Sequence, residues 1–597
     1  MVSRSLPRFR IIQDAAATSR FRVSFPTQLD LDLCRCSATG SKQGSLLGLL
    51  DHTRTAFGAR RLRDWLRSPL ASLPEIRQRQ NVVRFLTTVS SGRVVLEDLT
   101  ERVLRNARDL ERDLQGIHLG TASPQAIARL LRALDIVRDL PTILQSEENT
   151  PSMIQSLATM YPSLDQVIYG IQDVIDVAQD NTNSHEHALV ERFWNHIPDL
   201  ASQFEGVFAQ TQALEREQCQ LLERYRDMTQ LPELCYLDLR MGASRDVERV
   251  LCVPRGNTAD VIPPEWLMVN ATDSSVRFTT RELLALRQLH EELQTKQAQL
   301  LSASWKALLR HIDGLVYVDG MRVVEILATL DALCSLATVA WQQPGCVAPE
   351  FVDEGRVLRM ESARHPVLDS PLYVPTTIDL CGDDDWQLLI SGPNMGGKST
   401  LLRMVGCIVI LAHIGAFVPA KRVMLSVFDS VLSCMQRQGD CSLLIDRSDT
   451  KRPRLHVGTG GSATHEAQAI SRITQLATPR SLVLLDEVGF GLTSSQAMAL
   501  ASATVKYLQT RAGCLVLLST HMTQLLNDAS LRVQGRRVCM SHHVIQSENT
   551  VVFSYRPQDG VVAKERFALQ AAELAGLPQQ IIIDAATAFA LTDTHSN

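Results

Sequence analysis

Residues 387–400 read QLLISGPNMGGKST, and this stretch decides the fold of the second half of the chain. A strand-like apolar run leads into a loop that matches G-x-x-x-x-G-K-[ST] through Gly392, Gly397, Lys398 and Ser399, and a helical pattern follows. Glycines allow backbone N–H groups to curl around phosphates, and the start of a helix adds positive potential there. The stretch therefore predicts a nucleotide-binding loop between a buried strand and a helix.

The residue types in this loop predict separate tasks in holding ATP and Mg2+. We expect Lys398 to hold the β and γ phosphates and Ser399 to ligate Mg2+. Asn394 stands where an amide can reach the γ-phosphate or the attacking water. The candidate ATP-binding residues of the loop are Gly392, Pro393, Asn394, Met395, Gly396, Gly397, Lys398, Ser399 and Thr400.

Two further apolar runs, SLVLLDE at 481–487 and CLVLLST at 514–520, predict neighbouring buried strands of a parallel sheet. Ligands of such sheets lie at the carboxyl ends of the strands. We expect Asp486 to hold Mg2+ through water and Glu487 to act as general base for the attacking water. His521, just after the third strand, is a candidate catalytic residue that senses the γ-phosphate. Two adjacent buried acids are costly as a purely structural feature, because like charges repel and both lose solvation.

The first half of the chain has a helical pattern, with leucines at spacings of three and four from about 44 to 200. Two long amphipathic helices are predicted over about 202–228 and 281–312, and at about 1.5 Å per residue each would reach roughly 40 Å. Between them, residues 235–278 form short extended runs separated by Pro and Gly. This order predicts a helical arm with a small β insert at its tip.

The insert carries arginines that could contact phosphates. It also carries several acids, so the pattern on its own is more typical of a solvated surface. The candidate arginines are Arg240, Arg245, Arg249, Arg255 and Arg277.

Composition limits the class of protein. A chain of 597 residues is too long for one core, and its net charge of -5 means that any nucleic-acid contact must come from a local basic patch. Thirteen cysteines are scattered without a C-x2-C pair, which is typical of a reduced intracellular protein. No apolar run approaches the roughly 18 residues of a membrane helix. The arginine-rich start is interpreted as a disordered or truncated end, with a mitochondrial transit peptide as the alternative.

GPNMGGKST, VLLDEVG and LLSTH in that order, with ARHPVLDS before them and AGLPQQIIIDAA after them, resemble the ATPase domain of MutS-type DNA mismatch-repair proteins. GSLLGLLDHTRTAFGARRLRDWLRSPL resembles the start of that family's helical core. Within the family, LLDHTRTAFGARRL and YVPTTIDL are most similar to the eukaryotic third MutS homologue, which recognises insertion/deletion loops together with the second homologue. The resemblance covers nearly everything from about residue 26 to the end.

The resemblance implies a multidomain α and α/β fold: an all-α lever core, long helical arms with a small β clamp, and a P-loop ATPase domain that dimerises. The expected segments are 1–25 as a disordered or truncated end, 26–200 as helical core, 201–312 as arms with the clamp at about 235–280, 313–346 as the end of the core, 347–560 as ATPase domain and 561–597 as C-terminal helical dimerisation segment.

The resemblance also implies functional residues and partners. Tyr373 matches the aromatic residue that stacks on adenine, although a core tyrosine is the alternative, and Ser462 is the nearest match to the signature serine reached by the partner's ATP. The insert's arginines become candidate clamp contacts to the DNA backbone. Expected partners are duplex DNA, a second MutS-family subunit similar to the second homologue, and a MutL-type protein. The expected location is the nucleus, with the mitochondrion as the alternative.

This sequence also departs from the family's pattern. The mismatch-reading and connector domains have no room before the core, so we expect that this chain does not read mismatches itself. The loop after the acids reads GFGLTSS at 489–495 where the family usually has G-R-G-T-S-T, and Ser462 is one residue out of register with Asp486. These departures leave two alternatives open: a regulatory subunit with little turnover, and a subunit of the meiotic recombination branch that binds branched DNA.

Overall fold

The structure of the protein is a computed structural model. It describes residues 21–107, 109–145, 150–174, 190, 193–240, 247–255, 262–353, 355–368, 370, 373–381, 387–393, 396–435, 462–489, 492–522, 525, 535–545, 550–559, 569, 572–573 and 575–594. The chain forms two compact units, each described by itself. The first comprises Met1–Arg108, Asp139–Tyr161 and Val324–Asn597, and the second comprises Asp109–Arg138 and Pro162–Val323.

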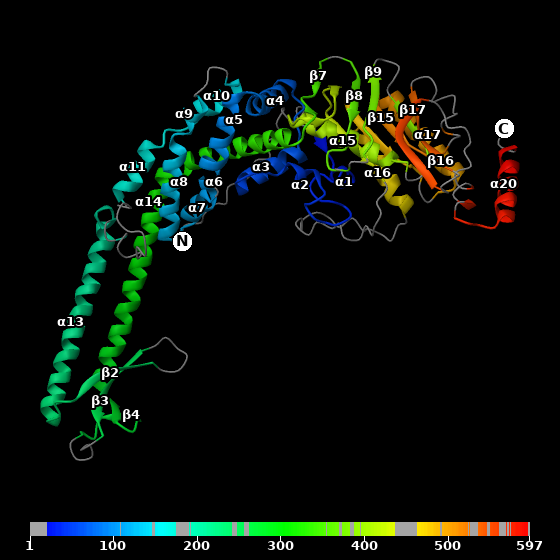
Figure 1. The fold of residues 1–597 in the computed structure, drawn as a ribbon. Helices are drawn as coiled ribbons and strands as arrows, with labels where there is room; N and C mark the ends of the chain where they lie inside the picture. The colour runs from blue at the N-terminus through cyan, green and yellow to red at the C-terminus, as the bar shows by residue number, and fades with distance from the viewer. Residues whose placement is uncertain are drawn as a thin grey trace. The chain divides into compact units, whose positions relative to one another are not determined.

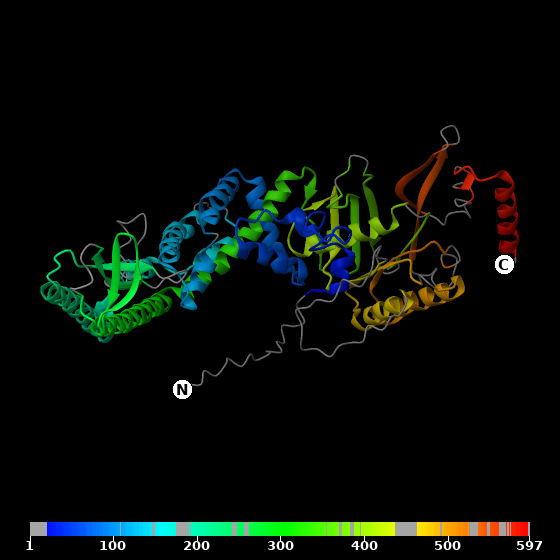
Figure 2. The ribbon, with the colours of Figure 1, turned by 90° about the horizontal axis from the view of Figure 1, so that it is seen from below.

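The first unit is built around a seven-stranded sheet with the order β1-β13-β14-β15-β10-β16-β17. The pairs from β1 to β16 are parallel. The long strands β16 and β17 pair antiparallel (Figures 1 and 2). Strands β10, β14 and β15 are buried at every residue, as their uniformly apolar sequences predict. The strands are β1 (Arg22–Val23), β10 (Gln387–Ser391), β13 (Ser430–Cys434), β14 (Ser481–Asp486), β15 (Leu515–Ser519), β16 (Gly535–Ile545) and β17 (Thr550–Asp559).

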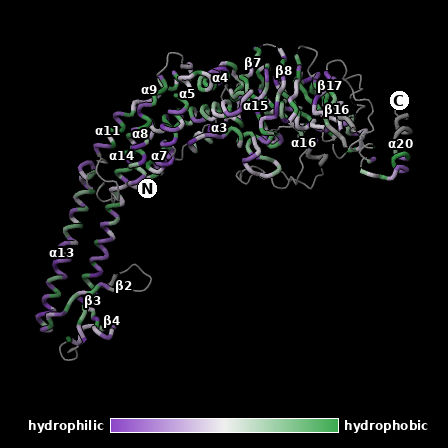
Figure 3. Tube along the Cα trace, viewed as in Figure 1, coloured by the Kyte–Doolittle hydropathy of each residue, from purple (hydrophilic) through white to green (hydrophobic). Residues whose placement is uncertain are grey.

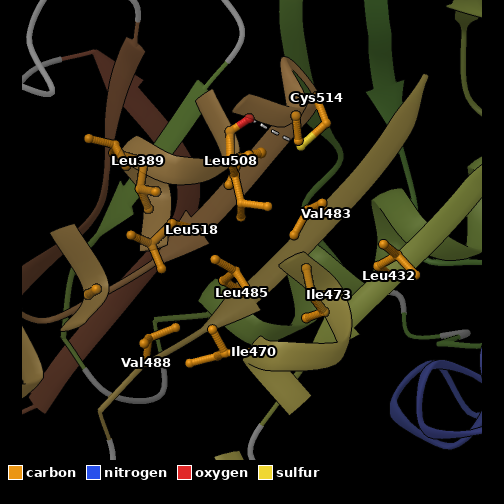
Figure 4. Close-up of a cluster of buried hydrophobic side chains, with 14 of the residues drawn as sticks. Leu389, Leu432, Ile470, Ile473, Val483, Leu485, Val488, Leu508, Cys514 and Leu518 are labelled. Atoms are coloured by element: carbon orange, nitrogen blue, oxygen red, sulfur yellow. Dashed lines mark hydrogen bonds between the residues drawn. The ribbon is translucent and has the colours of Figure 1, made fainter. Parts of the chain in front are cut away.

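Helix α15 (Lys398–His413) packs on β14 and β15, and α16 (Ser462–Leu476) packs on β13 and on α17 (Ser494–Tyr507). A core of apolar side chains from β10, β13, β14, β15, α16 and α17 fills the space between these elements (Figure 4). Each fully buried side chain of this size stabilises the fold by about 1.5–3 kcal/mol. This core holds the carboxyl ends of three neighbouring strands in fixed register, and those ends carry the candidate site.

Within the segment 1–25, expected as a disordered or truncated end, residues 22–25 contribute to this sheet and to the helix that follows it. Arg22 pairs with Ser430 on β13, and Phe21 is only 2% exposed. Helix α1 (Phe25–Asp30) follows, and its Asp30 accepts a hydrogen bond of 2.7 Å from Ser433 Oγ. A strand as short as β1 carries no periodic signal, so the pattern analysis missed it. Residues 1–20 lie outside the described residues.

Two smaller sheets complete the β structure described in the first unit. A four-stranded sheet has the order β7-β12-β8-β9, and a two-stranded sheet pairs β11 with β6. Their strands are β6 (Cys346–Val347), β7 (Glu350–Val352), β8 (Val357–Ala363), β9 (Thr376–Cys381), β11 (Val418–Pro419) and β12 (Arg422–Ser426).

The helical part of the first unit is held to helix α14 by a buried carboxylate. Asp331 is 1% exposed and accepts hydrogen bonds from the backbone N–H of Arg54 and from both the N–H and the hydroxyl of Thr55, which caps α3. The helices here are α2 (Leu46–Leu50), α3 (Ala56–Arg67), α4 (Leu73–Thr88), α5 (Ser90–Glu97), the π-helix η2 (Asp98–Leu104), α6 (Arg105–Ala107), α9 (Leu140–Leu144) and α10 (Ser152–Thr159). Near the C-terminus, α20 (Gln579–Thr594) is a further helix.

The second unit contains α13 (Pro198–Thr229), the first part of α14 (Arg281–Gln342) and a four-stranded sheet between them in sequence, with the order β2-β3-β5-β4. Hydrophilic and hydrophobic residues alternate along α13 (Figure 3). The strands are β2 (Cys235–Arg240), β3 (Val247–Pro254), β4 (Leu267–Ala271) and β5 (Ser275–Thr279), and the remaining elements are α7 (Leu110–His118), α8 (Pro124–Arg138), α11 (Asp165–Val174) and η3 (Trp194–His196).

Helix α14 is longer than predicted, because the segment expected as a separate end of the core continues the same helix to Gln342. By length and composition it contains a stretch apolar enough to cross a membrane, with a mean hydropathy of 1.8. That stretch is 78% buried inside the protein, as expected for a core helix.

Candidate functional site

The loop after β10 has a backbone conformation that requires glycine. Gly392 has φ +137°, and a Cβ built there would lie 2.7 Å from the carbonyl oxygen of Met540 on β16. Gly397 has φ +92° and is the N-cap residue of α15. Residues with a side chain rarely adopt such φ values, so the two glycines set the curvature that brings backbone N–H groups together.

Lys398 begins α15, and its ammonium group is held among oxygens at the loop. The side chain is 4% exposed, and Nζ donates to the carbonyl oxygens of Gly392 at 2.9 Å and Pro393 at 3.1 Å. Oε1 of Glu487 lies 3.5 Å from the same nitrogen. A buried cation with weak neutral acceptors and one carboxylate is well suited to receive phosphate oxygens.

The remaining loop residues are placed by the same turn. Ser399 and Thr400 are half-buried in the first turn of α15. Gly396 donates its N–H to Pro393 O at 3.2 Å. The candidates Asn394 and Met395 lie outside the described residues.

The acid pair lies at the end of β14. Asp486 is 6% exposed, and the hydroxyl of Ser519, its neighbour on β15, donates to Asp486 Oδ1. Glu487 has a left-handed φ of +49°, and its N–H donates to Ser519 O at 3.1 Å. A non-glycine residue held in this region costs on the order of 1 kcal/mol or more and is maintained only when its surroundings fix it. Here the strained turn brings the Glu487 carboxylate to Lys398.

His521 follows β15 and lies close to Glu487 of the acid pair. Its Nδ1 is 3.9 Å from Glu487 Oε1, and its side chain is 63% exposed. The structure therefore brings Lys398, Glu487 and His521 together at the carboxyl ends of three neighbouring strands.

Glu466 on α16 was not identified from the sequence, yet it holds the loop that follows the acids. Its Oε1 accepts a hydrogen bond from the N–H of Gly489, which has φ +98°. A Cβ built on Gly489 would lie 2.3 Å from Cβ of Ala497. Ser462 is the first residue of α16, and its side chain lies outside the described residues. A single glutamate on a helix face carries no sequence signal for a contact with a loop more than twenty residues away.

Two tyrosines flank α15 and its loop. Tyr373 is half-buried, its hydroxyl lies 3.4 Å from Sδ of Met404 on α15, and burial raises the pKa of Tyr373. Tyr555 on β17 lies against the loop, since a Cβ built on Gly397 would be 3.2 Å from its ring. The sequence did not identify Tyr555, because only the pairing of β16 with β10 and β17 places it there.

Three candidate arginines of the β2-β3-β5-β4 sheet already have hydrogen-bond partners within the protein. Arg249 donates to Asp238 at 2.8 Å and to Gln218 of α13 at 2.9 Å, and Asp238 raises the pKa of this guanidinium. Arg255 donates to a backbone carbonyl at 3.1 Å, and Arg277 donates to Asn270 at 3.3 Å.

Two candidates of the same set remain without a described side chain. Arg240 ends β2, and only its backbone is described, whereas Arg245 lies outside the described residues.

Comparison with known proteins matches this chain to models of MutS domain III over residues 27–337 and MutS domain V over residues 388–592. The chain is similar to the DNA mismatch repair protein msh3 of Aspergillus fumigatus, with 29% identity over 96% of this chain and 49% of the relative. It is also similar to the DNA mismatch repair protein MutS of Lactobacillus delbrueckii, with 28% identity over 98% of this chain and 64% of the relative. The chain thus spans about half the length of the fungal relative it matches.

Proposed function

This chain belongs to the MutS family, and on that premise we propose that it binds Mg2+-ATP at the loop of residues 392–400 and hydrolyses it to drive a DNA clamp in mismatch repair. One observation carries the proposal: Lys398 and the strained Glu487 meet within 3.5 Å at the carboxyl ends of parallel strands. Neither Lys398 nor Glu487 belongs to the hydrophobic core beside the site.

Each residue of the site has a distinct part in the proposed reaction. Lys398 exchanges its two carbonyl acceptors for phosphate oxygens, which are stronger partners because they are charged. Ser399 and Asp486 would hold Mg2+, which when bound neutralises charge on the phosphates. Glu487 accepts the proton of the attacking water, and His521 at 3.9 Å orients that carboxylate and responds to the γ-phosphate. Contact of Asn394 with the γ-phosphate or the attacking water stays a prediction from the sequence.

Aromatic residues on either side of the loop would hold the base. We assign Tyr373 to adenine stacking as the sequence suggested, and add Tyr555, whose ring already lies against Gly397. A base stacked on an aromatic ring is held through the π faces and tolerates small shifts of the phosphates.

The second unit would act as the clamp. Among the candidate arginines, Arg255 and Arg277 donate to neutral groups, so they are better candidates for phosphate contacts than Arg249, which is neutralised by Asp238. Such contacts position DNA without reading its sequence. Insertion/deletion loops as the lesion, a second MutS-family subunit and a MutL-type protein as partners, and the nucleus as location complete the proposal, supported by the similarity to msh3.

A regulatory subunit with little turnover is the second candidate function. Leu492 and Thr493 lead into α17 where the family usually carries a threonine and a serine. Binding would then survive while hydrolysis is slow.

ATP binding by Lys398→Ala tests the proposal. We expect Mg2+-ATP affinity to fall by at least about tenfold, because charge-assisted bonds contribute roughly 1.5–3 kcal/mol each. Lys421→Ala is the matched control, since Lys421 is a surface lysine paired with Glu361. Equal affinities for the two variants would remove the assignment of the loop.

A further inference from the structure

Two cysteines stand directly opposite each other in the sheet of the second unit. Cys235 on β2 pairs with Cys252 on β3, and Cys252 pairs in turn with Arg277 on β5. Both cysteines are free thiols, with Cys235 exposed and Cys252 half-buried. The strands are seen near the ends of α13 and α14 in Figure 1.

The pair lies on the face of the sheet that does not form its core. Successive side chains of a strand point to opposite faces. Tyr236, Leu251 and Phe278, the sequence neighbours of this row, pack into the apolar cluster with the helices. Cys235, Cys252 and Arg277 therefore share the opposite face, and the exposed Cys235 is reachable by a small reagent.

The spacing of the two residues is compatible with a covalent bond. Opposed residues of antiparallel strands have Cα atoms about 4.5–5.5 Å apart, and a disulfide needs roughly 4.4–6.8 Å. Their Cβ atoms are about 4.5–5.5 Å apart, against roughly 3.5–4.5 Å in a disulfide. Closure thus needs a local shift of about 1 Å or less, and the strands can supply it without losing register.

The two thiols already influence each other. Burial raises the pKa of Cys235, and the neighbouring Cys252 thiol raises it further, both as a charge and as a hydrogen-bond partner. The attacking thiolate is therefore scarce at neutral pH, and its reaction should accelerate as pH rises.

We propose that Cys235 and Cys252 form a reversible dithiol–disulfide site that ties β2 to β3. The Cys235 thiolate attacks oxidised glutathione, forms a mixed disulfide and releases one glutathione thiolate. The Cys252 thiolate then attacks the Cys235 sulfur and releases the second glutathione. One disulfide is thereby reduced, one is formed, and the two thiol protons pass to the released glutathione.

The bond would hold β2 and β3 at a fixed separation beside Arg277. Since Cys252 directly adjoins Arg277, oxidation would change the surroundings of a candidate phosphate contact. This site does not depend on ATP chemistry, and it stands if the proposed nucleotide site fails.

Peptide mapping of the whole chain tests the proposal. The protein is incubated with oxidised glutathione, unreacted thiols are blocked, and the non-reduced tryptic digest is analysed by mass spectrometry. Trypsin separates the two cysteines by cutting after Arg240 or Arg249. We expect a linked pair of peptides containing Cys235 and Cys252, which disappears on addition of excess reduced glutathione and forms faster at pH 8.5 than at pH 7.

Variants assign the link. Cys235→Ser and Cys252→Ser should each lose the linked pair, whereas Cys219→Ser and Cys381→Ser, which replace other exposed cysteines, should retain it. Separate glutathione adducts on Cys235 and Cys252 in the folded wild type, or no reaction at either, would overturn the proposal. Because the wild-type result decides the question, a variant that fails to fold leaves the test intact.

Discussion

Gly489→Ala adds only one methyl group but should lower the stability of the protein substantially. A Cβ at Gly489 would lie 2.3 Å from Cβ and 2.6 Å from Cα of Ala497, which is 5% exposed in α17. The left-handed backbone, with φ +98°, costs alanine about 1–2 kcal/mol. Overpacking of a buried contact adds about 1–3 kcal/mol. The expected destabilisation is therefore about 2–5 kcal/mol.

Gly345→Ala is the matched control for the backbone cost alone. Gly345 has φ +89°, and among the described residues nothing lies within 4 Å of a Cβ built there. We expect it to cost only the backbone share, about 1–2 kcal/mol. The two variants together isolate the contact with Ala497.

Thermal unfolding followed by circular dichroism measures both variants. One kcal/mol moves the midpoint by roughly 2–4 °C in a body of about 150–250 residues and by less in the larger first unit, so Gly489→Ala should melt about 1–4 °C below Gly345→Ala. Its ATP turnover should also fall, because the shifted loop leaves Glu466 and carries Glu487 away from Lys398. Equal midpoints with unchanged turnover would refute the reasoning that this loop is sterically fixed.

Further outcomes follow from other buried polar groups. Glu466→Ala should lower the ATP turnover rate without changing ATP affinity. Glu466→Gln keeps an acceptor for the Gly489 N–H and should retain most of the wild-type turnover rate. Steady-state kinetics measure the turnover rate and the apparent affinity separately. Asp331→Ala should lower the free energy of unfolding by about 2–5 kcal/mol in urea titrations, because it removes the acceptor of the Arg54 N–H and of the N–H and hydroxyl of Thr55. His413 is fully buried, and burial lowers its pKa to about 4. In the unfolded chain this histidine takes up a proton near pH 6.5, whereas in the folded protein it stays neutral down to about pH 4. The free energy of unfolding should therefore keep the full contribution of His413 above pH 6.5 and lose about 3 kcal/mol of it between pH 6.5 and 4. Urea titrations of wild type and His413→Asn over this pH range measure that loss.

Local patterns were enough to predict the strands at 387–391, 481–486 and 515–519 and the loop before Lys398. Each is a short, mostly apolar run, and the first two lead into glycine-containing loops, so the signal lies within about ten residues of sequence. The proximity of Lys398 and Glu487 could be anticipated because carboxyl ends of parallel strands share one edge.

Contacts that depend on distant pairing could not be anticipated in this way. Tyr555 reaches the loop only through the β10–β16–β17 pairing, and Arg249 is neutralised because the β2–β3 register places Asp238 opposite it. The β1 strand is too short for any periodicity, and the helix that begins at Arg281 lacked a stop signal at its expected end near residue 312. For Tyr555 and Arg249, the role of the side chain follows from its partner in space and not from its neighbours in sequence.

Single-turnover hydrolysis by Glu487→Gln tests the central claim most directly. Glutamine keeps the size of the side chain but removes the base, so ATP affinity should be retained within a few-fold while the hydrolysis rate falls by about 10²–10⁴. Glu361→Gln, at an exposed ion pair, should hydrolyse ATP at the wild-type rate. An unchanged hydrolysis rate in Glu487→Gln would contradict the assignment of ATP chemistry to this site.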